Sequence, residues 1–233
     1  MYSDKVSKYA QSIVTGEIPS CRYVKLACQR HLSDMDRIGD DDFPYTFSEE
    51  AAERFFKFCT YLKHYKGEYS GKSFKLEPWQ EFVFGSIYGW LNESKNWRFH
   101  YVYLEVPRKN GKTTMAAAGA AFDCAMVEQT GAEVYCVATK DDQAKLLYND
   151  CLAYINQSED LQEMFEVLQG RSTLYARDTS RTSFIKPLGA DSKRHDGLNP
   201  VSVYADELHA WPKRELWDVM EDAFGARNQY HMI

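Results

Sequence analysis

The chain has 233 residues, of which 44% are hydrophobic and 27% charged, and its formal net charge is −6. This composition is typical of a soluble globular protein, and a chain of this length can bury a substantial core. No apolar run reaches the ~18 to 20 residues that span a bilayer, and residues 1–5 lack the features of a signal peptide. The sequence therefore predicts a cytoplasmic protein that does not bind a membrane.

The net charge and the cysteine spacing exclude two further classes of protein, those with a broad basic surface for nucleic acid and those held together by disulfides. A net negative chain is not expected to wrap nucleic acid on a broad basic surface. The six cysteines are scattered without C-x-x-C spacing, so we expect reduced, packed thiols and no disulfide.

The first 72 residues predict a helical N-terminal segment, because their apolar residues recur at helical spacing and no strand signal interrupts them. The acidic linker at residues 40–44 separates two apolar stripes. Ser48 is the expected N-cap of the second helix, with Glu49 and Glu50 in its first turn. The stripes contain Val6, Tyr9, Ala10, Ile13 and Val14, and Ala51, Ala52, Phe55, Phe56, Cys59 and Leu62.

Residues 73–233 alternate between strand and helix signals. We predict a helix over residues 79–90, helices starting at Thr113, Asp141 and Lys213, and strands at 101–106, 133–138 and 201–205. Residues 171–176 and 182–187 are expected to form an antiparallel hairpin around a polar turn at 177–181. This order predicts an α/β fold with a mostly parallel sheet flanked by helices.

The segment from Val106 to Thr114 has the pattern of a phosphate-binding turn between a strand and a helix. The usual pattern is G-x-x-x-x-G-K-[ST], and Val106 stands where its first glycine would be. Gly111 would let the backbone approach a phosphate, Lys112 would reach the β and γ oxygens, and the Thr113 hydroxyl would hold Mg²⁺. The alternative interpretation is a chance Gly-Lys-Thr sequence in a surface turn.

Two adjacent carboxylates, Asp206 and Glu207, follow the apolar run at 201–205. A buried parallel strand presents residues at its C-terminal end to a ligand crevice, so Asp206 could bind Mg²⁺ there. Glu207 could orient and deprotonate an attacking water. The alternative is a helix N-terminus carrying acids.

Residues 139–144 follow the strand at 133–138. Capping of the next helix by Thr139, Asp141 and Asp142 is favoured there over contact with DNA.

Together these residues resemble the large terminase subunit of tailed bacteriophages, the motor that packages viral DNA. The resemblance rests on residues 106–113 as a variant phosphate loop, on residues 203–207 as the acidic strand end, and on residues 76–80, with further likeness at 8–10, 16–18 and 28–32. It implies a P-loop NTPase core of the RecA and helicase-like type at 73–233, with ATP and Mg²⁺ as cofactors.

The resemblance also implies roles for individual side chains. Gln80 matches the glutamine that reads adenine, although the residues alone favour an ordinary polar helix position. Arg108 matches the loop arginine assigned to the γ-phosphate, and Arg194 is the candidate for an arginine supplied to a neighbouring subunit, with a surface arginine or a DNA contact as the alternatives. Glu207, Arg108 and Arg194 are thus the predicted catalytic residues, Thr113 and Asp206 the metal ligands, and the nucleotide-binding set is Gln80, Arg108, Lys109, Asn110, Gly111, Lys112, Thr113 and Thr114.

The predicted partners follow from the same resemblance. They are double-stranded DNA, the portal protein, the small terminase subunit and further copies of the chain in a ring, in the cytoplasm of the bacterial host and outside the mature virion. Since the sequence stops where the coupling motif and nuclease domain would follow, DNA cleavage is not expected from it. The alternatives are a non-catalytic fragment that binds nucleotide or a partner, and a helicase-like translocase outside phage biology.

Overall fold

The computed structural model describes residues 4–127, 131–168, 172–177, 182–189 and 197–233. By contacts the chain forms two compact units. The first contains Met1–Thr60 and Lys75–Phe99, and the second contains Tyr61–Phe74 and His100–Ile233. The predicted division into domains at residue 72 stays a prediction.

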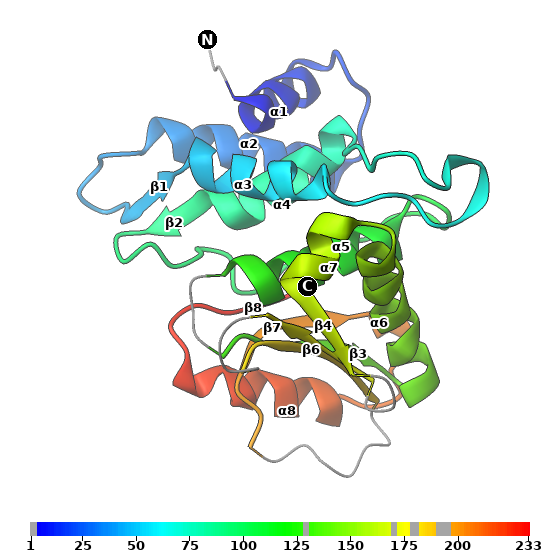
Figure 1. Cartoon of the computed structure of the whole chain (residues 1–233). Coiled ribbons are helices and arrows are strands. Elements are labelled where there is room, and N and C mark those ends of the chain that lie inside the picture. Colours follow the sequence, from blue (N-terminus) through cyan, green and yellow to red (C-terminus); the bar gives the residue numbers. More distant parts are fainter. Residues whose placement is uncertain (1–3, 128–130, 169–171, 178–181, 190–196) are drawn as a thin grey trace. The chain divides into compact units, whose positions relative to one another are not determined.

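The first unit packs four helices and a short sheet (Figure 1). Asp4 caps the first helix by accepting from the Ser7 N–H, and Ser48 caps the third by accepting from the Ala51 N–H at 3.1 Å, which confirms the predicted N-cap. The sequence showed no strand signal before residue 72, yet β1 forms there and pairs antiparallel with β2. The elements are α1 (Lys5–Thr15), α2 (Arg22–Asp36), β1 (Tyr45–Phe47), α3 (Glu49–Cys59), α4 (Pro78–Gly89) and β2 (Trp90–Asn92).

A buried histidine lies in the core of this unit. The Trp90 indole N–H donates to His31 Nδ1 at 3.0 Å, so the other ring nitrogen carries the proton and donates to Ser7 Oγ at 2.9 Å. The imidazole is 1% exposed and meets the rings of Phe47 and Phe82 edge-on. Burial lowers the pKa of His31 from 6.5 to about 4, which keeps the ring neutral.

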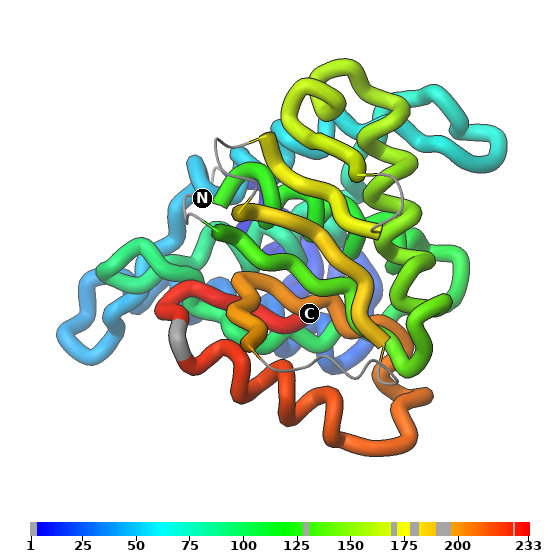
Figure 2. Tube along the Cα trace, turned by 60° about the horizontal axis from the view of Figure 1, so that its bottom comes forward, coloured from blue at the N-terminus to red at the C-terminus, as the bar shows by residue number. Residues whose placement is uncertain are grey.

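The second unit is built on a six-stranded sheet whose order is β4-β5-β6-β3-β7-β8 (Figures 1 and 2). β6, β3, β7 and β8 pair in parallel, and β4 and β5 add an antiparallel edge. The strands are β3 (Glu133–Ala138), β4 (Phe165–Leu168), β5 (Thr173–Ala176), β6 (Phe184–Gly189), β7 (Pro200–Ala205) and β8 (His231–Met232). The helices are α5 (Lys112–Met126), α6 (Asp141–Asn156), α7 (Glu159–Met164) and α8 (Glu215–Ala223), with short 3-10 turns η1 (Gly67–Tyr69), η2 (Leu208–Ala210) and η3 (Phe224–Ala226).

Helices cover both faces of this sheet, as Figure 1 shows. Alternate side chains of a strand point to opposite faces, so Val137 and Val203 pack against Met220 of α8. On the other face, α5 and α6 cover β3, and Tyr204 reaches the helix α5. The predicted α/β fold with a mostly parallel sheet flanked by helices is therefore confirmed.

A buried polar network joins three elements of this unit. The Asp123 carboxylate on α5 accepts from the Tyr204 hydroxyl of β7 at 2.6 Å and lies 2.7 Å from His231 Nε2 of β8. Asp123 and His231 are fully buried, and Tyr204 is 1% exposed. Gly119 leaves room for the tyrosine, because a Cβ there would lie 2.5 Å from the Tyr204 hydroxyl oxygen.

Several predicted elements agree with the structure. The strands at 133–138 and 201–205 are β3 and β7, the helix from Asp141 is α6, and the hairpin is the antiparallel pair β5 and β6. Residues 171 and 178–181 of the predicted hairpin lie outside the described residues. The helix predicted from Thr113 begins at Lys112, and the one predicted from Lys213 begins at Glu215.

The predicted strand at 101–106 is wrong. Tyr101 makes one parallel bridge to Met232, and the Val102 N–H donates to the Met232 carbonyl, but residues 102–106 form no strand. A strand needs a neighbour, and the adjacent β8 spans only two residues.

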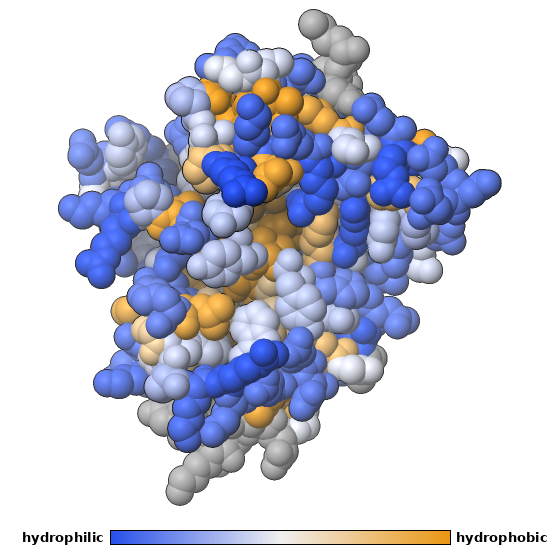
Figure 3. Space-filling model, turned by 180° about the vertical axis from the view of Figure 1, so that it is seen from behind, coloured by the Kyte–Doolittle hydropathy of each residue, from blue (hydrophilic) through white to orange (hydrophobic). Residues whose placement is uncertain are grey.

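Hydrophilic side chains predominate on the face shown in Figure 3, with smaller hydrophobic patches between them. All six cysteines are free thiols, and five are buried. Among the described residues, no helix is long and apolar enough to cross a bilayer.

Candidate functional site

The turn before α5 has a distinctive backbone conformation. Gly111 has φ +74° and is the N-cap of α5, and Lys109 also has a positive φ of +68°. The Asn110 amide donates to the carbonyls of Pro107 and Arg108 at 3.1 and 3.3 Å, which ties the turn together. A left-handed residue at position 111 favours glycine. The α5 residues that follow are small, so the helix packs closely on the sheet.

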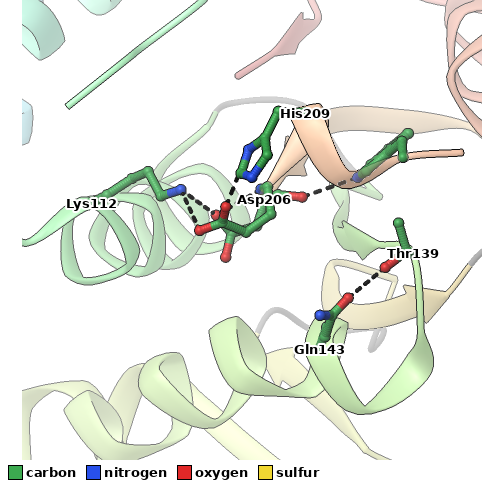
Figure 4. A network of polar contacts seen from close by, with 7 residues as sticks. Lys112, Thr139, Gln143, Asp206 and His209 are labelled. Atoms are coloured by element: carbon green, nitrogen blue, oxygen red, sulfur yellow. Dashed lines mark hydrogen bonds and ion pairs between the residues drawn. The ribbon is translucent and has the colours of Figure 1, made fainter. Parts of the chain in front are cut away.

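Lys112 joins this turn to the acidic end of β7. Its ammonium lies 3.1 Å from Asp206 Oδ1 and 2.9 Å from Glu207 Oε1 (Figure 4). These residues are almost a hundred positions apart in sequence, yet the structure brings them together as the motif order predicted. The cluster places one cation between two carboxylates at the C-terminal end of a parallel strand.

Neighbouring groups fix the acidic pair. The Asp206 N–H donates to the Val137 carbonyl at 3.0 Å, and the Asp206 carbonyl accepts from the Trp211 indole N–H at 3.0 Å. Glu207 has φ +50°, an uncommon conformation for a residue with a side chain, and its second oxygen lies 3.3 Å from His209 Nδ1. The contacts of Trp211 and His209 were not predicted, because nothing but nearness in sequence links them to the pair.

Electrostatics in the cluster favour the charged forms. The hydrogen bond from Lys112 is the main cause that lowers the pKa of Glu207, and the positive charges of Lys112, His209 and Arg108 add to it. Burial acts to lower the pKa of Lys112, but hydrogen bonds to Glu207 and Asp206 outweigh that effect and raise it. The site therefore carries an ammonium and an ionised Glu207 at neutral pH.

A comparison of the sequence with models of known protein families identifies the family of this chain. The model of the terminase large subunit ATPase domain matches residues 78–232, which is more than half of the chain. The chain belongs to this family.

The terminase fold is also found among solved structures. The crystal structure of the HK97 bacteriophage large terminase matches with a TM-score of 0.66 and 22% identity, over 78% of this chain and 36% of that protein. The ATPase domain of a Thermus phage large terminase and a variant of it match with TM-scores of 0.45 and 0.43, 20% and 21% identity, and 54% coverage of this chain and 55% of theirs. No curated protein sequence matches the chain. The HK97 likeness shows the P-loop NTPase fold, and the chain spans about a third of that protein's length.

The other predicted residues of this terminase ATPase site fall in different places. Thr113 and Thr114 lie in the first turn of α5, and the Thr114 carbonyl accepts from the Tyr154 hydroxyl at 3.4 Å. Arg108 is exposed in the turn, and Lys109 and Asn110 are exposed beside it. Arg194 lies outside the described residues.

Gln80 is part of the first unit, at the start of α4. It is 7% exposed, and its side-chain oxygen accepts from the Glu77 N–H at 2.8 Å. This contact is half of a capping arrangement, so the amide oxygen has a structural partner at the helix N-terminus. Its predicted contact with adenine stays a prediction.

Thr139 at the end of β3 does not cap α6, so the favoured interpretation was wrong for this residue. Its hydroxyl donates to the Gln143 side-chain oxygen (Figure 4), and Lys140 is the N-cap without a side-chain bond. Asp141 instead accepts from the Gly189 N–H at 2.8 Å, which fastens α6 to the end of β6.

Within the described residues, no three His, Cys, Asp or Glu side chains form a metal-binding cluster. Mg²⁺ prefers a few oxygen ligands and completes its shell with waters and substrate phosphates. The Asp206 carboxylate and the Thr113 hydroxyl are oxygen groups of the kind that this ion binds, so their chemistry fits Mg²⁺, and Asp206 contacts Lys112 in this structure.

Proposed function

We propose that this chain is the ATPase module of a phage DNA-packaging motor, and that it hydrolyses ATP to move viral DNA into the capsid. The observation that carries the proposal is the contact of Lys112 with both Asp206 and Glu207. It joins the phosphate turn to the acidic strand end, the two parts that such chemistry needs at one place.

Binding of a triphosphate requires Lys112 to change partners. Its side chain is 33% exposed, and those of its partners Glu207 and Asp206 are 48% and 22% exposed, so water screens both ion pairs and each is worth about 1 kcal/mol. Lys112 can therefore move to phosphate oxygens at small cost. That exchange would leave the Glu207 carboxylate without its main partner and available to orient a water.

Each residue then has a distinct task. Glu207 would hold the attacking water and accept its proton, while Lys112 and Arg108 would disperse charge on the transferring oxygens. The guanidinium of Arg108 suits charge spread over several oxygens better than a lysine does. Thr113 and Asp206 would hold Mg²⁺, which neutralises phosphate charge when bound. Gln80 would contact adenine, and Arg194 would act in the site of a neighbouring copy.

ATP turnover by the purified chain tests these roles. Glu207→Gln keeps the shape of the side chain but cannot accept the proton, so we expect turnover to fall at least about a hundredfold with nucleotide still bound. Lys112→Ala should weaken nucleotide binding as well. Glu163→Gln, an exposed residue of α7, is the matched control and should leave turnover unchanged. Wild-type rates in Glu207→Gln or Lys112→Ala would refute the proposal.

A second candidate is a non-catalytic module that binds nucleotide without hydrolysing it. It differs from the first candidate in one step: Glu207 would stay paired with Lys112 when nucleotide is bound and would not orient a water. Nucleotide binding by the wild-type chain with no turnover above Glu207→Gln would select this candidate.

The proposed motor role implies partners. They are double-stranded DNA, the portal protein, the small terminase subunit and other copies of the chain in a ring, within the cytoplasm of the infected host. Co-purification with portal protein, and ring formation in the presence of ATP, are the measurements that test them.

A further inference from the structure

A pocket of about 480 Å³ lies beside α8 in the second unit. It is lined by the chain before the phosphate turn, by η2, by α8 and by the segment that joins η2 to α8. A volume of this size suits a ligand with one or two rings. The lining residues are Tyr101, Leu208, Trp211, Lys213, Arg214, Trp217 and Glu221.

Three aromatic rings form the pocket wall, and hydrogen bonds hold their polar ends. The rings of Tyr101 and Trp217 are stacked, with centroids 6.1 Å apart and an angle of 27° between planes. Both donate to Glu221, from the Tyr101 hydroxyl at 3.0 Å and the Trp217 indole at 3.2 Å. The Trp211 indole is engaged with the Asp206 carbonyl. Since the polar ends are engaged, the ring faces that Tyr101 and Trp217 do not turn toward each other are what these side chains offer to a ligand.

Two cations border the same pocket. Lys213 pairs with Glu215 at 3.1 Å, and Arg214 pairs with Asp218 at 2.6 Å and with Glu221 at 3.3 Å. The Lys213 and Arg214 side chains are 71% and 72% exposed, so these surface pairs hold the cations weakly. The pocket and its border hold these two cations and three carboxylates, so an anionic group would bind by displacing a carboxylate from one of the weak pairs and not through a net positive charge.

We propose that this pocket binds an unpaired nucleotide of a nucleic-acid strand, with its base on the Tyr101 and Trp217 wall and its phosphate at Lys213 or Arg214. Aromatic faces beside cations are the combination that binds single strands without sequence preference. A peptide side chain would fill the ring site but bring no phosphate for the two cations. A free nucleotide would make one set of contacts with exposed cations. A strand can bind more tightly, because the nucleotides on either side of the bound one can add contacts of their own.

This pocket contains none of the residues predicted for the ATP site, although it adjoins them. Lys112 belongs to α5, which lies on the opposite face of the sheet from α8. The two sites touch through Trp211, which lines the pocket and holds the Asp206 carbonyl. Binding of a nucleic-acid strand needs no ATP hydrolysis. A chain that does not hydrolyse ATP could therefore still bind the strand, and the two proposals can fail separately.

Fluorescence anisotropy of a short labelled oligothymidylate, with the full chain and no ATP, measures the binding. Tyr101→Leu removes the ring face, and we expect binding to weaken by at least about fivefold. Lys213→Ala should weaken binding and reduce the slope of log affinity against log salt by about 0.7. The control Tyr103→Leu changes a tyrosine that is 76% exposed and outside the pocket lining, and Lys57→Ala changes an exposed lysine of α3. Both controls should bind like wild type.

Four outcomes would overturn the proposal. The first is equal binding by wild type, Tyr101→Leu and Lys213→Ala. The second is blunt duplex binding as tight as the single strand and equally sensitive to both changes. The third is full competition by thymidine monophosphate at the oligonucleotide's own concentration. The fourth is loss of portal binding or self-assembly in these variants while oligonucleotide binding is kept, which would assign the pocket to a protein partner. Urea unfolding of each variant separates lost binding from lost folding. Tyr101 and Lys213 are exposed, so both variants should unfold at the same urea concentration as wild type.

Discussion

Acid should destabilise the first unit through one buried imidazole. His31 accepts from Trp90 and donates to Ser7, and burial lowers its pKa from 6.5 to about 4. A folded-state pKa below the unfolded value means that the unfolded chain binds the proton first as pH falls. The contribution of His31 to stability is therefore complete above pH 6.5 and is lost as pH falls toward 4.

The size of this loss follows from the two pKa values. The difference between 6.5 and about 4, at about 1.36 kcal/mol for each pKa unit, gives a loss of about 3.4 kcal/mol well below pH 4. Between pH 7.5 and pH 5 the same linkage gives about 2 kcal/mol. This is a large share of the stability of an ordinary domain.

Urea unfolding followed by circular dichroism at pH 7.5 and pH 5 measures the effect. His31→Gln keeps one donor and one acceptor but cannot titrate, so its loss of stability over this range should be smaller than that of wild type by about 2 kcal/mol. Gln11→Ala removes an exposed, uncharged side chain of α1 and should keep the wild-type pH dependence. Equal pH dependence in wild type and His31→Gln would show that the buried imidazole does not stay neutral.

Three further changes test the second unit. Tyr204→Phe removes a donor from the buried Asp123 carboxylate and should lower the unfolding free energy by about 1–3 kcal/mol, and unchanged urea stability would contradict the described network. Gly119→Ala places a Cβ 2.5 Å from the Tyr204 hydroxyl and should cost roughly 1–3 kcal/mol, whereas Gly225→Ala meets nothing within 4 Å and should stay within about 0.5 kcal/mol. Gly111→Ala forces alanine to φ +74°, which should cost about 1–3 kcal/mol and weaken nucleotide binding in a titration; wild-type affinity would argue against the turn as the phosphate site.

Strands with strong local signals were predictable from the sequence. β3 and β7 are buried on both faces and consist mainly of apolar residues, so they appear as short continuous runs. The start of α6 at Asp141 follows from the acids in its first turn. These features depend on neighbouring residues, and sequence therefore suffices to locate them.

Features that depend on distant partners were not predictable. Residues 101–106 alternate as a strand does, but the pairing that would make them one is limited by the two residues of β8. β1 is only three residues long, and its partner β2 lies more than 40 positions later. Strand propensity states what a segment can form, while pairing decides what it forms.

The candidate site could be predicted from local sequence patterns, whereas the buried network around Asp123 could not. The phosphate turn and the acidic pair were predicted, and Lys112 brings them together as expected. The link between Asp123 and Tyr204 spans 81 positions, and the link to His231 spans 108. The one local sign was an isolated carboxylate, Asp123, among the small apolar residues of α5. Its partners could not be identified without the structure.

That network has a consequence for how related sequences can vary. Tyr204 fills the space left by the missing side chain at Gly119 and also donates a hydrogen bond to the buried Asp123 carboxylate. A relative that carries phenylalanine at the position of Tyr204 would relieve the closest contact that a Cβ at the glycine position would make, while the carboxylate in α5 would still have His231 as a partner. We therefore expect the residues at the positions of Gly119 and Tyr204 to be exchanged together during divergence, and those at the positions of Asp123 and His231 to form a second pair.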